Sequence, residues 1–143
     1  MKTGYLTLET HPEHRGLVRV LVKEELPNTQ AASYGSKIRY IARFDDIEAG
    51  QMHLHNLLHH TLIDLDNHIY RIDLDWVIAA IEAVDLRHNR VWIDPSLSDS
   101  EKQVIDAQTA KLKLRHKRWN TFWLIVGGFF VVLFFILSTI GQI

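Results

Sequence analysis

The chain lacks cysteine altogether and holds only 3 prolines among its 143 residues. Without cysteine it can form neither disulfides nor thiolate metal sites, and it cannot use a thiol nucleophile. The phosphate-cradling glycine motifs G-x-x-x-x-G-K-S/T and G-x-G-x-x-G are absent, as is the G-x-S-x-G elbow of serine hydrolases. The sequence therefore carries no recognisable catalytic motif and favours a non-catalytic role.

Acidic residues are missing from the last quarter of the chain. All 17 Asp and Glu lie between Glu9 and Asp106. Of the 16 Lys and Arg, 5 lie between Lys111 and Arg118, which leaves 11 against 17 acids in residues 1–110, a balance of −6. Nucleic-acid binding depends on neutralising phosphates, so we expect no nucleic-acid partner for so acidic a domain.

Charge of either sign is absent from Trp119 to Ile143. A helix rises about 1.5 Å per residue, so roughly 20 residues cross a hydrocarbon core of about 30 Å. The remaining residues are too few to surround such a helix on all sides and still build a core of their own. The sequence predicts a transmembrane helix over 119–143, which would be the tail anchor of a single-pass membrane protein.

Basic residues gather directly before this span, and two tryptophans mark the same end, where indole rings favour the headgroup layer. By the positive-inside rule we expect the N-terminal domain in the cytoplasm and the C-terminus on the far side. The lipid bilayer, with its anionic headgroups, is thus an expected partner. The predicted membrane-interface residues are Lys111, Lys113, Arg115, Lys117, Arg118, Trp119 and Trp123.

The predicted span has no ionisable residue, so it offers no proton or ion path of its own. Gly127 and Gly128 leave room for another helix to approach closely, and Phe129 and Phe130 follow them. Two interpretations stay open: these four residues form a docking face for a partner helix, or they face lipid. Self-association through the span, giving a homo-oligomer, is a third alternative.

Residues 1–97 show the periodicities of a soluble α+β domain. Apolar residues at helical spacing predict helices over 45–62, capped by Asp45 or Asp46, and over 74–86, capped by Asp73. The core-facing positions of these helices are Ile47, Leu54, Leu57, Leu58 and Thr61 in the first and Val77, Ile78, Ile81 and Val84 in the second. We expect a small, mostly antiparallel sheet with two or three helices covering one face. The β-rich or alternating runs that predict strands are 5–9, 17–23, 36–44, 63–72 and 90–93. The alternation within 36–44 predicts a half-buried strand whose buried face carries Ile38, Tyr40, Ala42 and Phe44.

Ser98 and Glu101 form an S-x-x-E capping box, which predicts the start of a third helix. No Gly or Pro follows before Gly127. We therefore expect one helix to run from an amphipathic, basic juxtamembrane segment at 98–118 into the span at 119–143.

Five of the 9 histidines fall between His53 and His68. On the predicted helix, His55 and His59 are i, i+4 neighbours, and Glu48 extends the same flank. His and Glu are zinc ligands, but a closed site needs three or four of them, and the H-E-x-x-H form is absent. Polar histidines without any metal are the alternative, and apart from this divalent metal no cofactor is predicted.

Asp64 and Asp66 would share one face of a strand, where two carboxylates can hold a hard cation or act as an acid and a base. Solvated carboxylates on an exposed strand are the alternative.

These features favour a tail-anchored accessory or regulatory subunit, or adaptor, that docks a small cytoplasmic domain on a larger integral membrane protein complex. The alternative is a membrane-anchored, His-rich metal-binding or hydrolytic protein using His55, His59 and Glu48, with Asp64 or Asp66 as further ligands.

Overall fold

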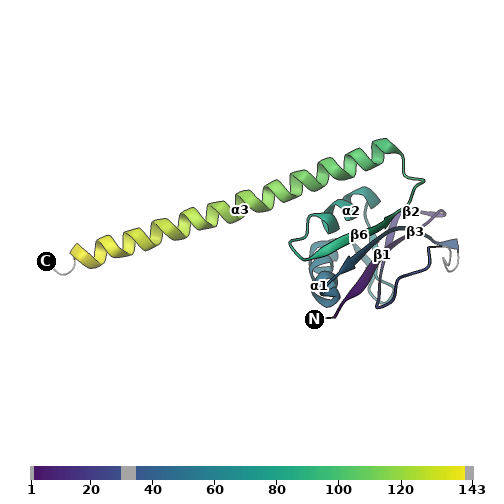
Figure 1. Cartoon of the computed structure of the whole chain (residues 1–143), viewed down its shortest axis with the longest axis horizontal. Helices are drawn as coiled ribbons and strands as arrows, with labels where there is room; N and C mark the ends of the chain where they lie inside the picture. The colour runs from purple at the N-terminus through teal and green to yellow at the C-terminus, as the bar shows by residue number, and fades with distance from the viewer. Residues whose placement is uncertain (1, 30–34, 141–143) are drawn as a thin grey trace.

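The computed structural model describes residues 2–29 and 35–140. They form an α+β domain from which one long C-terminal helix projects (Figure 1). The domain contains a six-stranded sheet in the order β4-β5-β2-β1-β3-β6, and every neighbouring pair is antiparallel. The predicted α+β class with a mostly antiparallel sheet is confirmed. The strands are β1 (Gly4–His11), β2 (His14–Lys23), β3 (Lys37–Phe44), β4 (Leu62–Asp64), β5 (Ile69–Arg71) and β6 (His88–Ile93).

Strand β1 lies at the centre of the sheet and is buried on both faces. Leu6 and Leu8 are fully buried in the main core, and Thr7 and Glu9, which point the other way, are also buried. β2 and β3 both pair antiparallel with β1, so they run parallel to each other, and the chain between them must return along the length of the sheet.

Helix α1 (Ile47–Leu58) starts at Asp46, whose carboxylate accepts a hydrogen bond from the Ala49 amide at 3.2 Å. It ends four residues earlier than predicted. Residues His59–Thr61 form a 3-10 turn, η2, and the Thr61 hydroxyl donates to the Leu58 carbonyl at 2.8 Å. This bond satisfies a carbonyl at the helix end and directs the chain into β4.

Two details of α1 differ from the periodicity. Leu57, predicted for the core, is 40% exposed, because the buried stripe runs through Ile47, Gly50, Leu54 and Leu58. Gly50 contributes by its small size: a Cβ there would lie 2.9 Å from the Phe44 ring. The helix therefore approaches β3 closely at this point.

Helix α2 (Leu74–Glu82) buries the predicted core residues Val77, Ile78 and Ile81. Asp73 occupies the N-cap position, as predicted, but its side chain makes no capping hydrogen bond. The helix also ends before the predicted Leu86, because the Val84 amide bonds the Ile81 carbonyl in a tighter turn. Val84 is buried in the loop that follows.

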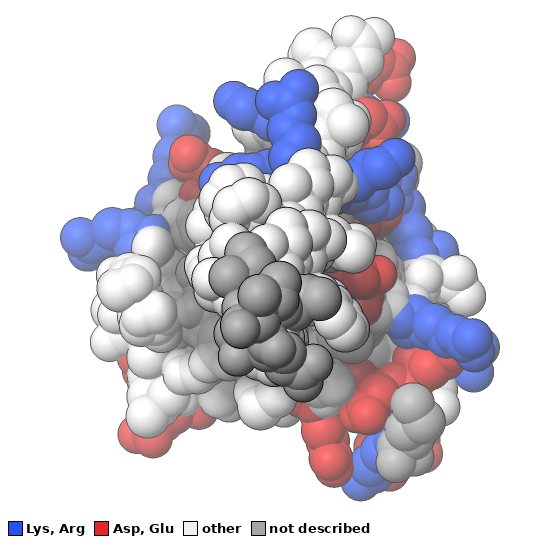
Figure 2. Space-filling model, turned by 90° about the vertical axis from the view of Figure 1, so that its left-hand side faces the viewer, with Lys and Arg blue, Asp and Glu red and all other residues white. Residues whose placement is uncertain are grey.

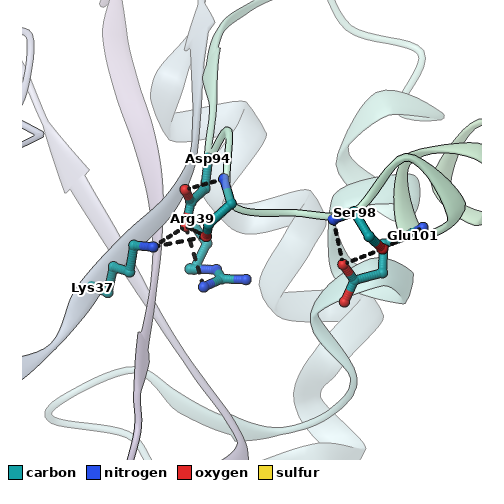
Figure 3. A network of polar contacts seen from close by, with 6 residues as sticks. Lys37, Arg39, Asp94, Ser98 and Glu101 are labelled. Carbon is teal, nitrogen blue, oxygen red and sulfur yellow. Dashed lines mark hydrogen bonds and ion pairs between the residues drawn. The ribbon is translucent and has the colours of Figure 1, made fainter.

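Helix α3 (Asp99–Ile140) contains 42 residues and begins at the predicted capping box. The Ser98 amide donates to the Glu101 carboxylate at 2.7 Å, and the Glu101 amide donates to the Ser98 hydroxyl at 3.3 Å. The box is confirmed. Figure 3 shows it a few residues after Asp94, at the end of the loop that leaves β6.

Asp94 joins β3 to the start of α3 (Figure 3). Its buried carboxylate lies 2.7 Å from the Lys37 ammonium and 3.2 Å from the Arg39 guanidinium, and it accepts from the Ser96 amide at 2.9 Å. Burial alone would raise the pKa of Asp94, but the hydrogen bonds from Lys37 and Ser96, with the Arg39 charge, outweigh it and lower that pKa.

A second polar cluster ties α3 to the domain. Glu82 at the end of α2 accepts hydrogen bonds from the Tyr40 hydroxyl at 2.5 Å and from the Arg90 guanidinium at 2.7 Å. Arg90 also lies 3.6 Å from Asp106 on α3. The sheet, α2 and α3 are therefore connected through the Arg90 guanidinium and the carboxylates of Glu82 and Asp106.

Candidate membrane interface

The first part of α3 packs against α2 in the manner of an ordinary amphipathic helix. Ile105 is 1% exposed, Thr109 is buried, and Leu112 is partly buried against the core. The Thr109 hydroxyl donates to the Ile105 carbonyl at 2.8 Å, so its polar group is satisfied within the helix. This stripe fixes the direction in which the remainder of α3 leaves the domain.

The second part of α3 has no such cover. Within 2–29 and 35–140, α3 is the helix long and apolar enough to cross a membrane, and none of its apolar stretch is buried. Leu124 is 77% exposed and Phe134 is 70% exposed. A contiguous apolar surface of this kind calls for a surrounding of lipid or protein. The prediction of a membrane-spanning helix is thus supported by length, composition and exposure together.

The predicted basic residues divide between two faces of α3. Successive residues of a helix are rotated by about 100°, so Lys113 and Lys117 share one face. Lys111, Arg115 and Arg118 lie together on roughly the opposite face. In Figure 2, which looks along α3 from its C-terminal side, Lys and Arg side chains accordingly stand on several sides of the apolar helix.

The face of α3 that carries Lys113 and Lys117 borders a groove of about 360 Å³. The opposite wall is the loop after α2, in which Ala83 and Val84 are buried and Asp85 is exposed. The helix contributes side chains spaced by three or four residues over three turns. They are Lys113, His116, Lys117, Asn120, Thr121 and Leu124.

Trp119 and Trp123 are exposed one helical turn apart, and their rings meet edge to face with centroids 5.9 Å apart. They form an aromatic pair at the start of the apolar stretch. This is the position that tryptophan favours at the headgroup layer.

The predicted helix-packing residues are not brought together on one face. α3 continues unbroken through Gly127, Gly128, Phe129 and Phe130, and four consecutive helical residues point around the whole circumference. A Cβ added at either glycine would meet nothing within 4 Å. The two glycines thus leave an open notch on the groove side of the helix, while Phe129 points to the opposite side.

The predicted metal ligands lie apart. Glu48 is two helical turns, about 10 Å, before His55, and His59 lies beyond the end of α1. The His55 ring nitrogen Nδ1 is 3.2 Å from the Tyr70 hydroxyl, and His59 Nδ1 donates to the Asn56 carbonyl at 2.6 Å. Among the described residues no group of three or more His, Cys, Asp or Glu could hold a metal. The metal site stays a prediction without a geometry to support it.

Asp64 and Asp66 separate as well. Asp64 accepts hydrogen bonds from the Asn67 side chain at 2.8 Å and the Asn67 amide at 3.1 Å. These bonds lower the pKa of Asp64 and close the turn between β4 and β5. Asp66 is exposed in that turn.

Comparison with known proteins adds no relative. No protein-family model, no curated protein and no solved structure matches this chain.

The groove at the base of the apolar stretch is the feature that sequence reasoning missed. Its helical wall has a signal in the sequence, because Lys113, Lys117 and Leu124 recur at helical spacing. Its other wall, Asp85 with the buried Ala83 and Val84, is brought there by the packing of α2 on α3. The helical spacing alone could have divided the basic residues between two faces of the helix. It could not have predicted that the loop with Asp85 lies opposite one of them.

Proposed function

We propose that this protein is a membrane-anchored accessory or regulatory subunit that holds its α+β domain against a larger integral membrane protein complex. The observation that carries the proposal is the continuity of α3. One helix packs on α2 through Ile105 and continues without interruption into an exposed apolar stretch. The domain is thereby held at a defined height above the bilayer rather than on a flexible linker.

Such a tether supports binding by weak contacts. A domain confined near the membrane meets a membrane partner at an effective concentration far above its concentration in solution, so a small contact surface suffices. Gly127 and Gly128 provide the place where a partner helix can approach closely. With the basic residues at the cytoplasmic side, the domain faces the cytoplasm.

Purification from native membranes in mild detergent tests the proposal. We expect a larger integral membrane protein to co-purify in fixed stoichiometry, and Gly128→Leu to reduce its yield by filling the notch. Phe129→Leu is the matched control, because it lies on the other side of the helix and should retain the partner. A monomer, or an assembly of this chain alone, in several mild detergents would reject the proposal.

The orientation is tested by accessibility, since the chain has no cysteine of its own. Ser100→Cys introduces a single thiol on the exposed first turn of α3. We expect a membrane-impermeant maleimide to label it only when it is applied from the cytoplasmic side. Labelling from the outer side in intact cells would reverse the assigned orientation.

A further inference from the structure

The groove beside α3 combines opposite charges on opposite walls. Lys113 and Lys117 line the helical wall, and Asp85 stands on the loop wall. All three side chains are exposed, and none takes part in the ion pairs formed between the described residues. Two cations and one anion thus face a common space without neutralising one another.

The loop wall is more negative than Asp85 alone makes it. Helix α2 ends at Glu82, next to Ala83, and the carbonyls at a helix C-terminus carry partial negative charge. The helical wall supplies further polar atoms through His116 and the Asn120 amide. A ligand that fits must present an anionic group to α3 and a cationic hydrogen-bond donor to the loop.

The position of the groove indicates the class of ligand that it can bind. Lys117 lies just before the uncharged stretch, and Leu124, at the lower end of the groove, lies inside it. The groove therefore crosses from the headgroup layer into the hydrocarbon region. A ligand there has a polar head and an apolar tail.

We infer that the groove between α3 and the Ala83–Asp85 loop binds the headgroup of an aminophospholipid. Its phosphodiester lies against Lys113 and Lys117, its primary ammonium lies against Asp85 and the C-terminal end of α2, and its acyl chain descends along Leu124. Phosphate favours ammonium groups and ammonium favours carboxylates, so each wall meets the group that matches its charge. The inference rests on insertion of α3 in a membrane, as the proposed function does, but it requires no protein partner.

Charge-matched lipids separate this site from general attraction to a basic segment. Phosphatidylethanolamine and phosphatidylcholine have the same net charge, but only the former has N–H donors. Phosphatidylserine and phosphatidylglycerol also share a net charge, and only phosphatidylserine has an ammonium. The full chain, purified and delipidated in mild detergent, is mixed with equimolar lipids of each pair, and retained lipids are counted by native mass spectrometry.

We expect one bound lipid per chain and a preference of about tenfold for the amino lipid in each pair, the size of one charge-assisted hydrogen bond. Lys113→Ala/Lys117→Ala should abolish retention of this lipid. Asp85→Asn, which keeps the shape of the side chain, should bring both preferences toward one. Lys111→Ala/Arg115→Ala removes the same charge from the opposite face and should leave retention and preference unchanged.

The inference would be overturned by equal retention within each lipid pair, by equal losses in the two double variants, or by displacement by soluble O-phosphoethanolamine. The last would indicate a site for a free phosphate compound rather than for a lipid. Loss of a co-purifying protein in the Lys113→Ala/Lys117→Ala variant, without any lipid on the unmodified chain, would assign the groove to a protein contact instead. Because lipid retention and partner co-purification are separate readouts, either can fail alone.

Discussion

The two halves of α3 share one unbroken backbone but have different surroundings. From Asp99 to Leu112 the helix is amphipathic and buries a stripe on α2, with Ile105 1% exposed. From Trp119 to Leu137 it is uncharged and mostly apolar, and none of its apolar stretch is buried. In the first half the protein itself provides the apolar environment. In the second half the environment must come from outside the chain.

This difference separates two kinds of stability. The first half contributes to the folding of the domain, because its apolar contacts form only when α2 is in place. The second half contributes to partition between water and bilayer, because its apolar surface is the same whether or not the domain is folded. Mutations in the two halves should therefore affect different measurements.

The largest effect is expected from charge in the second half. Val131→Arg with Leu133→Arg places two guanidinium groups near the middle of the apolar stretch, at about 2.5–3.5 kcal/mol each, or about 5–7 kcal/mol together, against insertion. We expect the protein to leave the membrane fraction on alkaline carbonate extraction. Gln103→Arg with Ala107→Arg adds the same charge to exposed positions of the first half and should leave it in the membrane. A doubly charged span that stays inserted would contradict the lipid assignment.

The next effect concerns the stripe in the first half. Ile105→Ala removes a buried side chain and should lower the free energy of unfolding of the domain by about 2–5 kcal/mol. The measurement is chemical denaturation of the full chain in mild detergent, followed by near-ultraviolet circular dichroism. Val104→Ala, at a position 44% exposed, should change this free energy by less than about 0.5 kcal/mol. Equal effects of the two substitutions would mean that the stripe does not pack as described.

A third, smaller effect is expected at the junction that positions α3. Asp94→Asn removes the charge that Lys37 and Arg39 neutralise, and should cost about 1.5–3 kcal/mol in the free energy of unfolding. The pKa of Asp94 is lower in the folded chain than its ordinary value of 3.8, so the unfolded chain binds this proton more readily. The contribution is fully present above pH about 4 and is lost as the pH falls through the folded-state pKa.

The pKa of Glu82 is shifted in the same direction as that of Asp94. Burial opposes the shift, but the hydrogen bonds from Arg90 and Tyr40 hold the pKa of Glu82 below its ordinary value of 4.5. Denaturation at pH 7 and at successively lower pH should therefore show stability falling on acidification. Asp94→Asn should weaken that dependence. If the Asp94→Asn variant keeps the pH dependence of the unmodified chain, Asp94 does not contribute to that dependence.

The smallest effect is expected at the start of α3. Ser98→Ala removes the capping hydroxyl and should lower the free energy of unfolding by about 1 kcal/mol. In the second half, Thr121→Val removes a hydroxyl that donates to the Lys117 carbonyl of its own helix, and should change domain stability by less than about 0.5 kcal/mol. Thermal melts of the two variants measured side by side would sharpen the contrast. An effect of Thr121→Val as large as that of Ser98→Ala would contradict this difference between the two halves of α3.

Much of the fold could be predicted because its signals are local. The alternation of Ile38, Tyr40, Ala42 and Phe44 predicted one buried face of β3, and all four are buried. The capping box at Ser98 and Glu101 placed the start of α3 within a residue. Patterns of this kind are written into neighbouring residues and need no knowledge of the tertiary structure.

The errors occur where distant contacts decide. α1 ends at Leu58 because the chain must turn into β4, and Leu57 lies beside the buried stripe rather than in it. Sheet order and the return of the chain between β2 and β3 also depend on pairings between residues far apart in sequence, which periodicity does not encode.

The candidate site shows the same division. The uncharged stretch and its basic flank follow from composition alone. That Lys113 and Lys117 face Asp85, whereas Lys111 and Arg118 do not, depends on which side of α3 packs against α2. Gly127 to Phe130 were predicted either to form a docking face or to face lipid. As consecutive helical residues they point around the whole circumference of α3, and their role stays a prediction.

α3 runs straight in Figure 1, so a tilt of the proposed membrane span is transmitted to the domain. The 21 residues from Asp99 to Trp119 form an arm of about 30 Å. Leaning the anchor by about 20°, an ordinary value for membrane helices, would carry the far end of that arm about 10 Å sideways over the membrane surface. Rotating the anchor about its own axis would turn the domain through the same angle. Bilayer thickness, or a partner helix in contact with the membrane-spanning part of α3, would thus determine the orientation of the domain.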